Sequence, residues 1–194
     1  MRRWIMLPLA LVLAGTGSAV VPLAASAATP AAAVTTCPTG WGSLPKAASG
    51  TGGQHALTGI RTGQQPCFDR MVLDIPGASS SALVGYHVQY VTTLYQDGSG
   101  KPLPIAGGAV LEIVAVAPAY DPATGSPTYP AHAGQALPGV NLAGYSTFRD
   151  AKFASSFEGQ TQVGLGVRAR LPFRVFQLDN RLVIDVAHSW SATR

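Results

Sequence analysis

Short apolar runs, each closed by a turn signal, recur along the chain from residue 55 onward and constrain its fold most strongly. No window of twelve or more residues shows a 3.6-residue apolar period, so amphipathic helices are not expected. The runs are rich in β-branched and aromatic residues or alternate apolar with polar, which is typical of strands. We expect strands at 55–61, 68–75, 85–95, 109–117, 145–153, 160–171, 173–178 and 181–187. Seven to eight strands at this spacing predict an all-β fold, either an antiparallel β-sandwich or a partly open barrel, with a disordered N-terminal arm.

Residues 118–144 interrupt this pattern with a stretch that is long for a loop in a compact domain. The stretch contains five prolines, and glycines recur through it. Two interpretations stay open: the segment is a functional flap, or it contains a short helix or strand. The last two runs, in contrast, are separated only by Asp179-Asn180, and this spacing predicts a hairpin.

The first 27 residues have the organisation of a secretory signal peptide. Met1–Arg3 supply positive charge, residues 4–24 carry no charge, and Ala25–Ala27 form a small-residue cleavage site. A membrane anchor is the main alternative, but two prolines and two glycines interrupt the apolar run and no positive flank follows it. A lipoprotein is a weaker alternative, because Cys37 lies ten residues beyond the expected cut. We therefore expect a secreted protein without a membrane span after cleavage.

Residues 28–54 are rich in Ala, Thr, Gly and Ser, which predicts an arm or linker, disordered up to Cys37, before a domain at 55–194. Trp41 is the one large aromatic residue of this arm, and we expect it to pin the arm to the domain. Cys37 and Cys67 are the only cysteines, and in an oxidising compartment an even pair predicts a disulfide. Closing this loop would contribute about 3 kcal/mol in the chain-entropy description. A metal site is disfavoured because two thiols without further ligands do not form a zinc cage.

The expected strand at 160–171 carries the most informative pattern for ligand binding. Its alternate positions place Gly164, Gly166, Arg168 and Arg170 on one face, opposite an apolar face. Glycine inside a strand marks close approach of a ligand or another backbone, and arginine binds carboxylate or phosphate through two parallel bonds. One interpretation is an exposed face that binds anionic ligands. The alternative is that a Trp or Tyr side chain covers the glycines while the arginines pair with carboxylates such as Asp74 or Asp185.

Few other patterns indicate catalysis or a cofactor. The nine carboxylates show no spacing that nominates the facing pair a glycoside hydrolase needs. The four histidines lack metal-ligand spacing, and neither a GxSxG turn nor a phosphate-binding loop occurs. Without residues 1–27 the formal charge falls from +4 to +2, eleven basic minus nine acidic residues, and no Lys/Arg run is present. We therefore expect no catalytic residue, no metal, no cofactor and no nucleic-acid partner.

Several segments together resemble the AMIN-like domain of secreted actinobacterial proteins. They are Cys67–Gly77 (CFDRMVLDIPG), Gly85–Val91 (GYHVQYV), Ala117–Asp121 (APAYD), Phe157–Arg168 (FEGQTQVGLGVR) and Arg181–His188 (RLVIDVAH). The resemblance covers roughly residues 55–190 and implies an exported β-sandwich-type domain with no known catalytic residues. The family is similar in outline to the AMIN domain found beside cell-wall amidases, which is associated with envelope targeting and peptidoglycan binding. This sequence differs from that setting because no amidase domain follows.

The sequence leads to two hypotheses for the function. The first is a non-catalytic secreted cell-envelope module that binds peptidoglycan or another anionic wall polymer, with salt-sensitive binding on an exposed Gly164/Gly166/Arg168/Arg170 strip. The second is a secreted protein–protein interaction module, which acts through an edge strand or the 118–144 loop and has an envelope protein as its partner.

Overall fold

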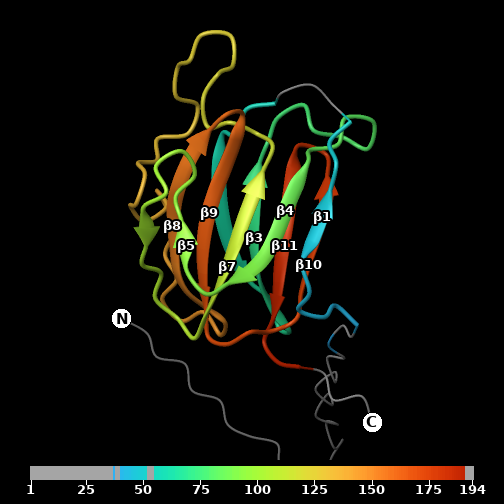
Figure 1. The fold of residues 1–194 in the computed structure, drawn as a ribbon. Coiled ribbons are helices and arrows are strands. Elements are labelled where there is room, and N and C mark those ends of the chain that lie inside the picture. Colours follow the sequence, from blue (N-terminus) through green and yellow to red (C-terminus); the bar gives the residue numbers. More distant parts are fainter. Residues whose placement is uncertain (1–36, 38–39, 52–54, 191–194) are drawn as a thin grey trace, which may run out of the picture. The chain divides into compact units, whose positions relative to one another are not determined.

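A computed structural model describes residue 37, residues 40–51 and residues 55–190 of the chain. The expected signal peptide at 1–27 and the arm at 28–36 lie outside the described residues. The described part contains strands and loops and no helix (Figure 1). The strands are β1 Lys46–Ala48, β2 Gly59–Gln64, β3 Phe68–Asp74, β4 Tyr86–Val91, β5 Leu94–Tyr95, β6 Pro102–Leu103, β7 Ala109–Ala115, β8 Phe148–Phe157, β9 Gln160–Val167, β10 Phe173–Leu178 and β11 Arg181–Ala187.

Two antiparallel sheets face each other and form a sandwich (Figure 1). One sheet has five strands in the order β1-β4-β7-β9-β8, and the other has four in the order β10-β11-β3-β2. The short strands β5 and β6 form a separate two-stranded ribbon. The all-β antiparallel sandwich predicted from the spacing of apolar runs is therefore confirmed, and the sheets do not close into a barrel.

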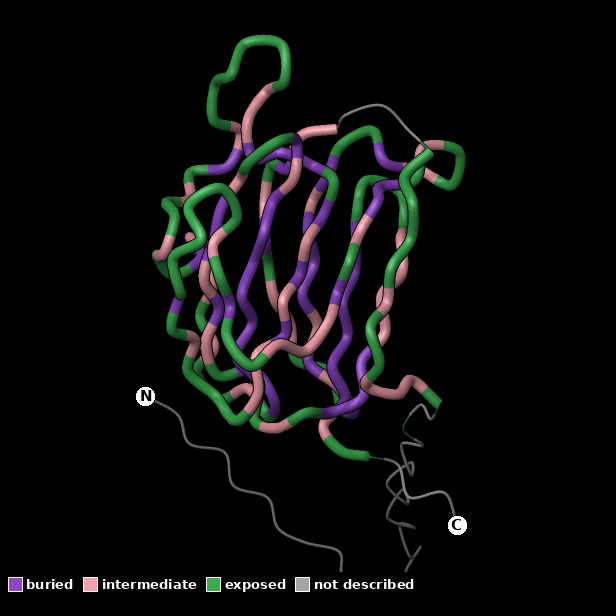
Figure 2. Tube along the Cα trace, in the orientation of Figure 1, coloured by how far each residue is buried: buried purple, intermediate pink, exposed green. Residues whose placement is uncertain are grey.

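The core lies between the two sheets, whose strands carry most of the buried residues (Figure 2). Leu111, Ile113 and Leu165 of the five-stranded sheet meet Met71, Leu73, Leu182 and Ile184 of the four-stranded sheet, all fully buried. Burying an aliphatic side chain of this size contributes about 1.5–3 kcal/mol. The alternation seen in the sequence at 68–75 and 181–187 thus selects the inward face of each strand.

Of the last four strands, two have the predicted bounds and two, β8 and β9, differ from the expected 145–153 and 160–171. β10 and β11 have the predicted bounds, and Leu178 pairs with Arg181 across the Asp179-Asn180 turn. β8 continues to Phe157 because the turn that ends it is Glu158-Gly159, where both residues have positive φ (48° and 79°). β9 stops at Val167 instead of residue 171, since the Arg168 amide leaves the sheet and donates to the Thr147 carbonyl.

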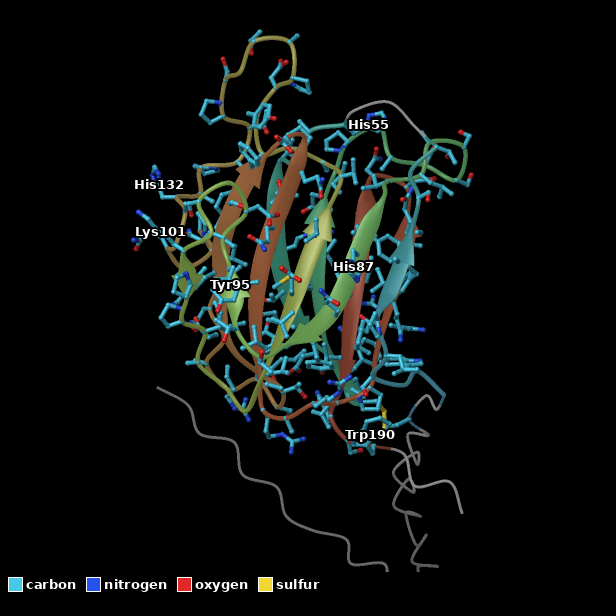
Figure 3. All side chains as sticks on the ribbon, in the orientation of Figure 1. His55, His87, Tyr95, Lys101, His132 and Trp190 are labelled. Atoms are coloured by element: carbon cyan, nitrogen blue, oxygen red, sulfur yellow. A yellow bond between two sulfur atoms is a disulfide. The ribbon has the colours of Figure 1, made fainter. Side chains whose placement is uncertain are left out.

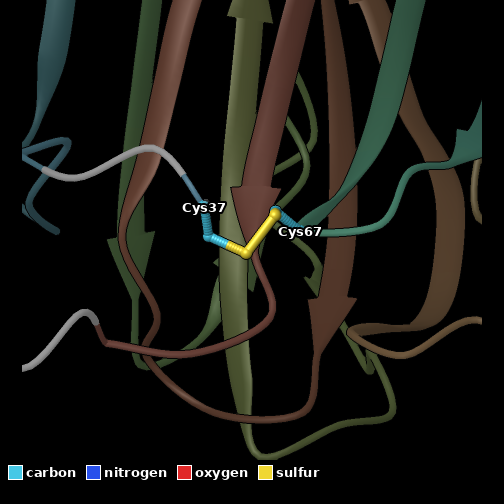
Figure 4. Close-up of a disulfide and its surroundings, with 2 residues drawn as sticks. All are labelled: Cys37 and Cys67. Atoms are coloured by element: carbon cyan, nitrogen blue, oxygen red, sulfur yellow. A yellow bond between two sulfur atoms is a disulfide. The ribbon is translucent and has the colours of Figure 1, made fainter. Parts of the chain in front are cut away.

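The segment before residue 55 is more ordered than the predicted linker. Lys46–Ala48 form β1 and pair with β4 at the edge of the five-stranded sheet. The disulfide between Cys37 and Cys67 is confirmed, with Cα atoms 5.3 Å apart (Figure 4). The Trp41 ring packs edge-on against Phe68 at 5.5 Å, as expected for a residue that pins the segment to the domain. Residues 41–48 therefore pack on the folded domain instead of forming a separate linker.

Residues 118–144 form no regular strand, but part of this segment covers the outer edge of β8. Gly134 donates to the Phe153 carbonyl, Phe153 donates to Gln135, and Leu137 donates to Ala151. These bonds occupy the outer edge of β8, which would otherwise offer free main-chain groups to another chain. Part of the long loop is thus engaged within the domain and unavailable to a partner through its backbone.

Candidate functional site

The two glycines of the predicted binding strip are buried within the protein. Gly164 lies under Leu94 and Ile105, and a Cβ added to it would come within 2.5 Å of the Leu94 side chain. Gly166 lies under the Ala106 carbonyl, so that an added Cβ would overlap that oxygen. The prediction of an exposed strip is therefore wrong for the glycines. The close approach that glycine permits is made by aliphatic side chains at Gly164 and by main chain at Gly166, and no Trp or Tyr ring is among the nearest groups.

The covering segment is fitted to β9 by two further glycines. Gly107 has φ +145°, and a Cβ there would lie 2.8 Å from the Val167 carbonyl oxygen. At Gly108 an added Cβ would overlap the Arg168 carbonyl, while its amide donates to Val167 at 2.8 Å. Residues 105–108 therefore lie in direct main-chain contact with the end of β9, just before Arg168 and Arg170.

Arg168 and Arg170 are exposed, as expected, but they follow the strand instead of lying on its face. Arg168 donates to the carbonyl oxygens of Ser146 and His188. Arg170 donates to the hydroxyl and carbonyl oxygens of Ser43, at 3.3 and 3.2 Å, and lies over the Tyr90 ring at 5.2 Å. Within the described part of the chain neither arginine contacts a carboxylate, so their charges are not neutralised.

The carboxylates suggested as their partners bind other arginines. Asp74 pairs with Arg61 at 2.9 Å, on the surface. Asp185 is fully buried on the outward side of the four-stranded sheet and binds two arginines. Arg70 contacts both of its oxygens, at 2.6 and 2.9 Å, and Arg174 binds at 2.8 Å. The expected pairing of Arg168 and Arg170 with Asp74 or Asp185 is therefore wrong.

Arg70 and Arg174 also stack on aromatic rings, forming a layer over the outer face of the four-stranded sheet. Arg174 lies 4.5 Å from the Trp41 ring and 4.8 Å from Phe176. Arg70 lies 5.1 Å from the Phe68 ring. Cation–π contacts of this kind contribute roughly 0.5–1 kcal/mol each at exposed sites. The layer was not predicted, although the register Arg70–Asp185–Arg174 across three strands would have revealed it once strand pairing was known.

This layer continues onto the end of the sandwich where Arg168 and Arg170 lie. Trp41 is followed by Ser43, which binds Arg170, and the Trp190 indole donates to the Arg170 carbonyl at 3.1 Å. Trp190 is 55% exposed and lies at the lower end of the sandwich in Figure 3. We call the whole region the arginine surface. It comprises Trp41, Phe68, Arg70, Arg168, Arg170, Arg174, Phe176 and Trp190.

Asp69 is a second buried carboxylate at this end of the sandwich. Asp69 accepts hydrogen bonds from the Thr147 and Phe148 amides at 2.6 and 3.1 Å. Asp69 also contacts the His188 ring at 3.0 Å. Since these contacts tie β3 to the start of β8 and the end of β11, they fix the backbone that carries Arg168.

The outer face of the five-stranded sheet holds an acidic cavity of about 460 Å³. His87, Asp97, Glu112 and Glu158 line it, and Figure 3 shows His87 on this face. Glu112 accepts hydrogen bonds from Gln89 and Gln162, whereas burial, and secondarily the charge of Glu112, raises the pKa of Asp97. Sequence spacing gave no sign of this grouping. No set of three His, Cys, Asp or Glu side chains among the described residues is arranged to hold a metal ion.

The described residues thus form an antiparallel sandwich with a disulfide and a cationic, aromatic surface, and disulfides are typical of domains in oxidising compartments. The AMIN-like domain family matches the chain over residues 55–188, and the protein belongs to this family. Membership indicates a cell-wall-associated module, and the disulfide is consistent with an extracytoplasmic location. Neither the curated proteins nor the solved structures contain a significant match. Among the described residues no helix has the length and hydropathy needed to cross a bilayer.

Proposed function

We propose that this protein is a secreted, non-catalytic envelope module that binds peptidoglycan or another anionic wall polymer through the arginine surface. The observation that carries the proposal is the state of Arg168 and Arg170. Both are exposed, both are positioned by neutral oxygens, and neither meets a carboxylate among the described residues. Of the four residues of the predicted strip, only the two arginines support this proposal, because both glycines are buried.

The surrounding residues favour a polymer that carries both charge and sugar rings. A guanidinium presents its donors in a fixed fork that matches carboxylate and phosphate. The exposed indole of Trp190, which donates to the Arg170 carbonyl, offers a flat apolar face near these groups. Because the arginines are at the surface, their attraction to a polyanion is screened by salt, and binding weakens as ionic strength rises.

Co-sedimentation of the purified secreted form with isolated cell-wall sacculi tests this function. We expect pelleting at low salt that falls at high salt and falls again in Arg168→Gln/Arg170→Gln. The control is Arg181→Gln, which removes an exposed arginine from the start of β11, at the opposite end of that strand from His188. Circular dichroism establishes that each variant is folded. Absence of pelleting at both salt concentrations contradicts the proposal.

A protein partner is a second candidate because no described strand pairs with the outer edge of β2. The Gln65 amide donates to Phe68, so alternation along the strand directs the amides of Ile60, Thr62 and Gln64 away from β3. No main-chain hydrogen bond from another described segment reaches these three residues. An extended segment of an envelope protein could add to this edge as a further strand.

The two functions respond to different substitutions. Gln64→Pro removes one outward amide from the β2 edge without altering the arginine surface. Capture of one envelope protein that is lost in Gln64→Pro and retained in Arg168→Gln/Arg170→Gln supports the edge function. Capture that is unchanged in Gln64→Pro contradicts it.

A further inference from the structure

Arg170 also lines a cavity that the arginine surface alone does not describe. The cavity has a volume of about 440 Å³ and lies between the end of β4 and residues 105–110. Its lining includes Tyr90, Thr92, Ile105, Gly107, Val110 and Arg170. A volume of this size lies within the range of about 300–1,000 Å³ that is typical of small-molecule sites.

The wall formed by residues 105–108 is held in place by the protein itself. Ala106 lies directly on Gly166, and Gly107 and Gly108 lie against the main chain of Val167 and Arg168. The Ala106 amide donates to the Asp150 carboxylate at 2.9 Å, which anchors the same segment from the β8 side. The glycine-rich pattern of β9 thus has a physical role: it allows a main-chain segment to pack closely and shape the cavity.

The cation of this cavity is oriented without being neutralised. Ser43 holds the guanidinium through the Nε and Nη2 atoms, and the Tyr90 ring lies beneath it at 5.2 Å. Burial raises the pKa of Tyr90 to about 12, so its phenol is uncharged at neutral pH and supplies no counter-charge. None of the residues that line the cavity is acidic. A guanidinium that is oriented by neutral groups beside an open cavity, with no carboxylate among the described residues around it, is suited to an anion.

We infer that this cavity binds one anionic unit of the wall polymer: a carboxylate or phosphate on Arg170, with an attached sugar-sized body against Tyr90, Ile105 and Val110. The inference deepens the proposed function and rests on it, because it names the unit of the polymer that the arginine surface recognises. The Thr92 hydroxyl is exposed at the rim and can bond a hydroxyl of that body. The aliphatic side chains face its apolar C–H groups.

Titration of the ¹⁵N-labelled secreted form with three small probes tests this inference. N-acetylmuramic acid carries a carboxylate, N-acetylglucosamine lacks it, and glycerol 3-phosphate supplies the alternative anion. We expect amide shifts at residues 90–92 and 105–110 with at least one of the two anions. N-acetylglucosamine should bind roughly tenfold more weakly or not at all, as expected for loss of a charge-assisted bond. The anion that binds more tightly identifies the source as a carboxylate or a phosphate.

Two variants test separately the charge of Arg170 and the open volume of the cavity. Arg170→Gln should weaken binding of the anion roughly tenfold or more, and Thr92→Trp should block the cavity while leaving Arg170 in place. Arg181→Gln, remote from the cavity, should bind as the unaltered protein does. Equal shifts with N-acetylmuramic acid and N-acetylglucosamine, or no shift with any probe, would overturn the inference. If the probes fail in this way but the protein still co-sediments with sacculi, only the inference is refuted. If co-sedimentation is also lost, the proposed function is refuted with it.

Discussion

Replacing Asp185 with asparagine removes one buried charge and almost no volume, so its effect reports the electrostatics of the arginine–aromatic layer. The Asp185 carboxylate is 0% exposed and binds Arg70 and Arg174. Breaking a buried ion pair typically costs about 3–5 kcal/mol, because the remaining charge loses its partner. Here the two arginine side chains keep 28% and 38% exposure, so water solvates part of the charge left behind. We therefore expect Asp185→Asn to lower the free energy of unfolding by about 3 kcal/mol.

Urea denaturation followed by tryptophan fluorescence measures this loss, since Trp41 lies against Arg174. For a domain of this size, 3 kcal/mol corresponds to a Tm lower by about 6–12 °C. Asp74→Asn provides the matched control, because its partner Arg61 is 53% exposed. Such a surface pair contributes about 0–1 kcal/mol. Equal losses in the two variants would refute the reasoning that burial of the carboxylate decides the energy.

Three further predictions concern the close packing, the disulfide and the acidic cavity. Gly166→Ala should cost about 3 kcal/mol or more in a denaturant titration, because its Cβ overlaps the Ala106 carbonyl, whereas Gly63→Ala, with open space around it, should be nearly neutral. Cys37→Ser/Cys67→Ser should lower the free energy of unfolding by about 3–4 kcal/mol, and a loss well above this range in urea denaturation would contradict the entropic account. The raised pKa of Asp97 favours its neutral form in the folded state, so its contribution is present below the unfolded value of 3.8 and is lost as pH rises through the folded pKa. Asp97→Asn should therefore stabilise the protein at pH 7 by less than about 1 kcal/mol and have no such effect near pH 3, as measured by thermal unfolding at both pH values.

Most strands were predictable because their signals are local, but the strand expected at 55–61 lies at 59–64, the one expected at 85–95 divides into β4 and β5, and β6 was not predicted. The hairpin at 173–178 and 181–187 was located to the residue, since alternation and a two-residue turn depend only on neighbours in the chain. β1 was missed because a three-residue strand of Lys and Ala carries no pattern of its own. Its pairing with β4 supplies the order that the composition of the segment does not indicate.

The site was only partly predictable, because its determinants are long-range. The glycines of β9 correctly indicated close approach, but nothing near them in the sequence identifies Ala106 as the group that approaches. The sequence also does not show that Arg70 and Arg174 pair with a carboxylate, because this pairing depends on contacts between distant strands. Arg70 lies opposite Asp185 only once β3 is known to pair with β11. Local pattern thus located Arg168 and Arg170, while tertiary pairing decided what surrounds them.

The pairing of β3 with β11 also sets the order in which this protein can fold. The bond between Arg70 and Asp185 joins residues 115 positions apart, so the four-stranded sheet lacks a central strand until the end of the chain arrives. Contacts of such long sequence separation slow folding. Cys37 and Cys67, only 30 positions apart, can meet much earlier. A chain delivered with its N-terminus first would therefore hold its first covalent crosslink while most of its sheet pairing is still unformed.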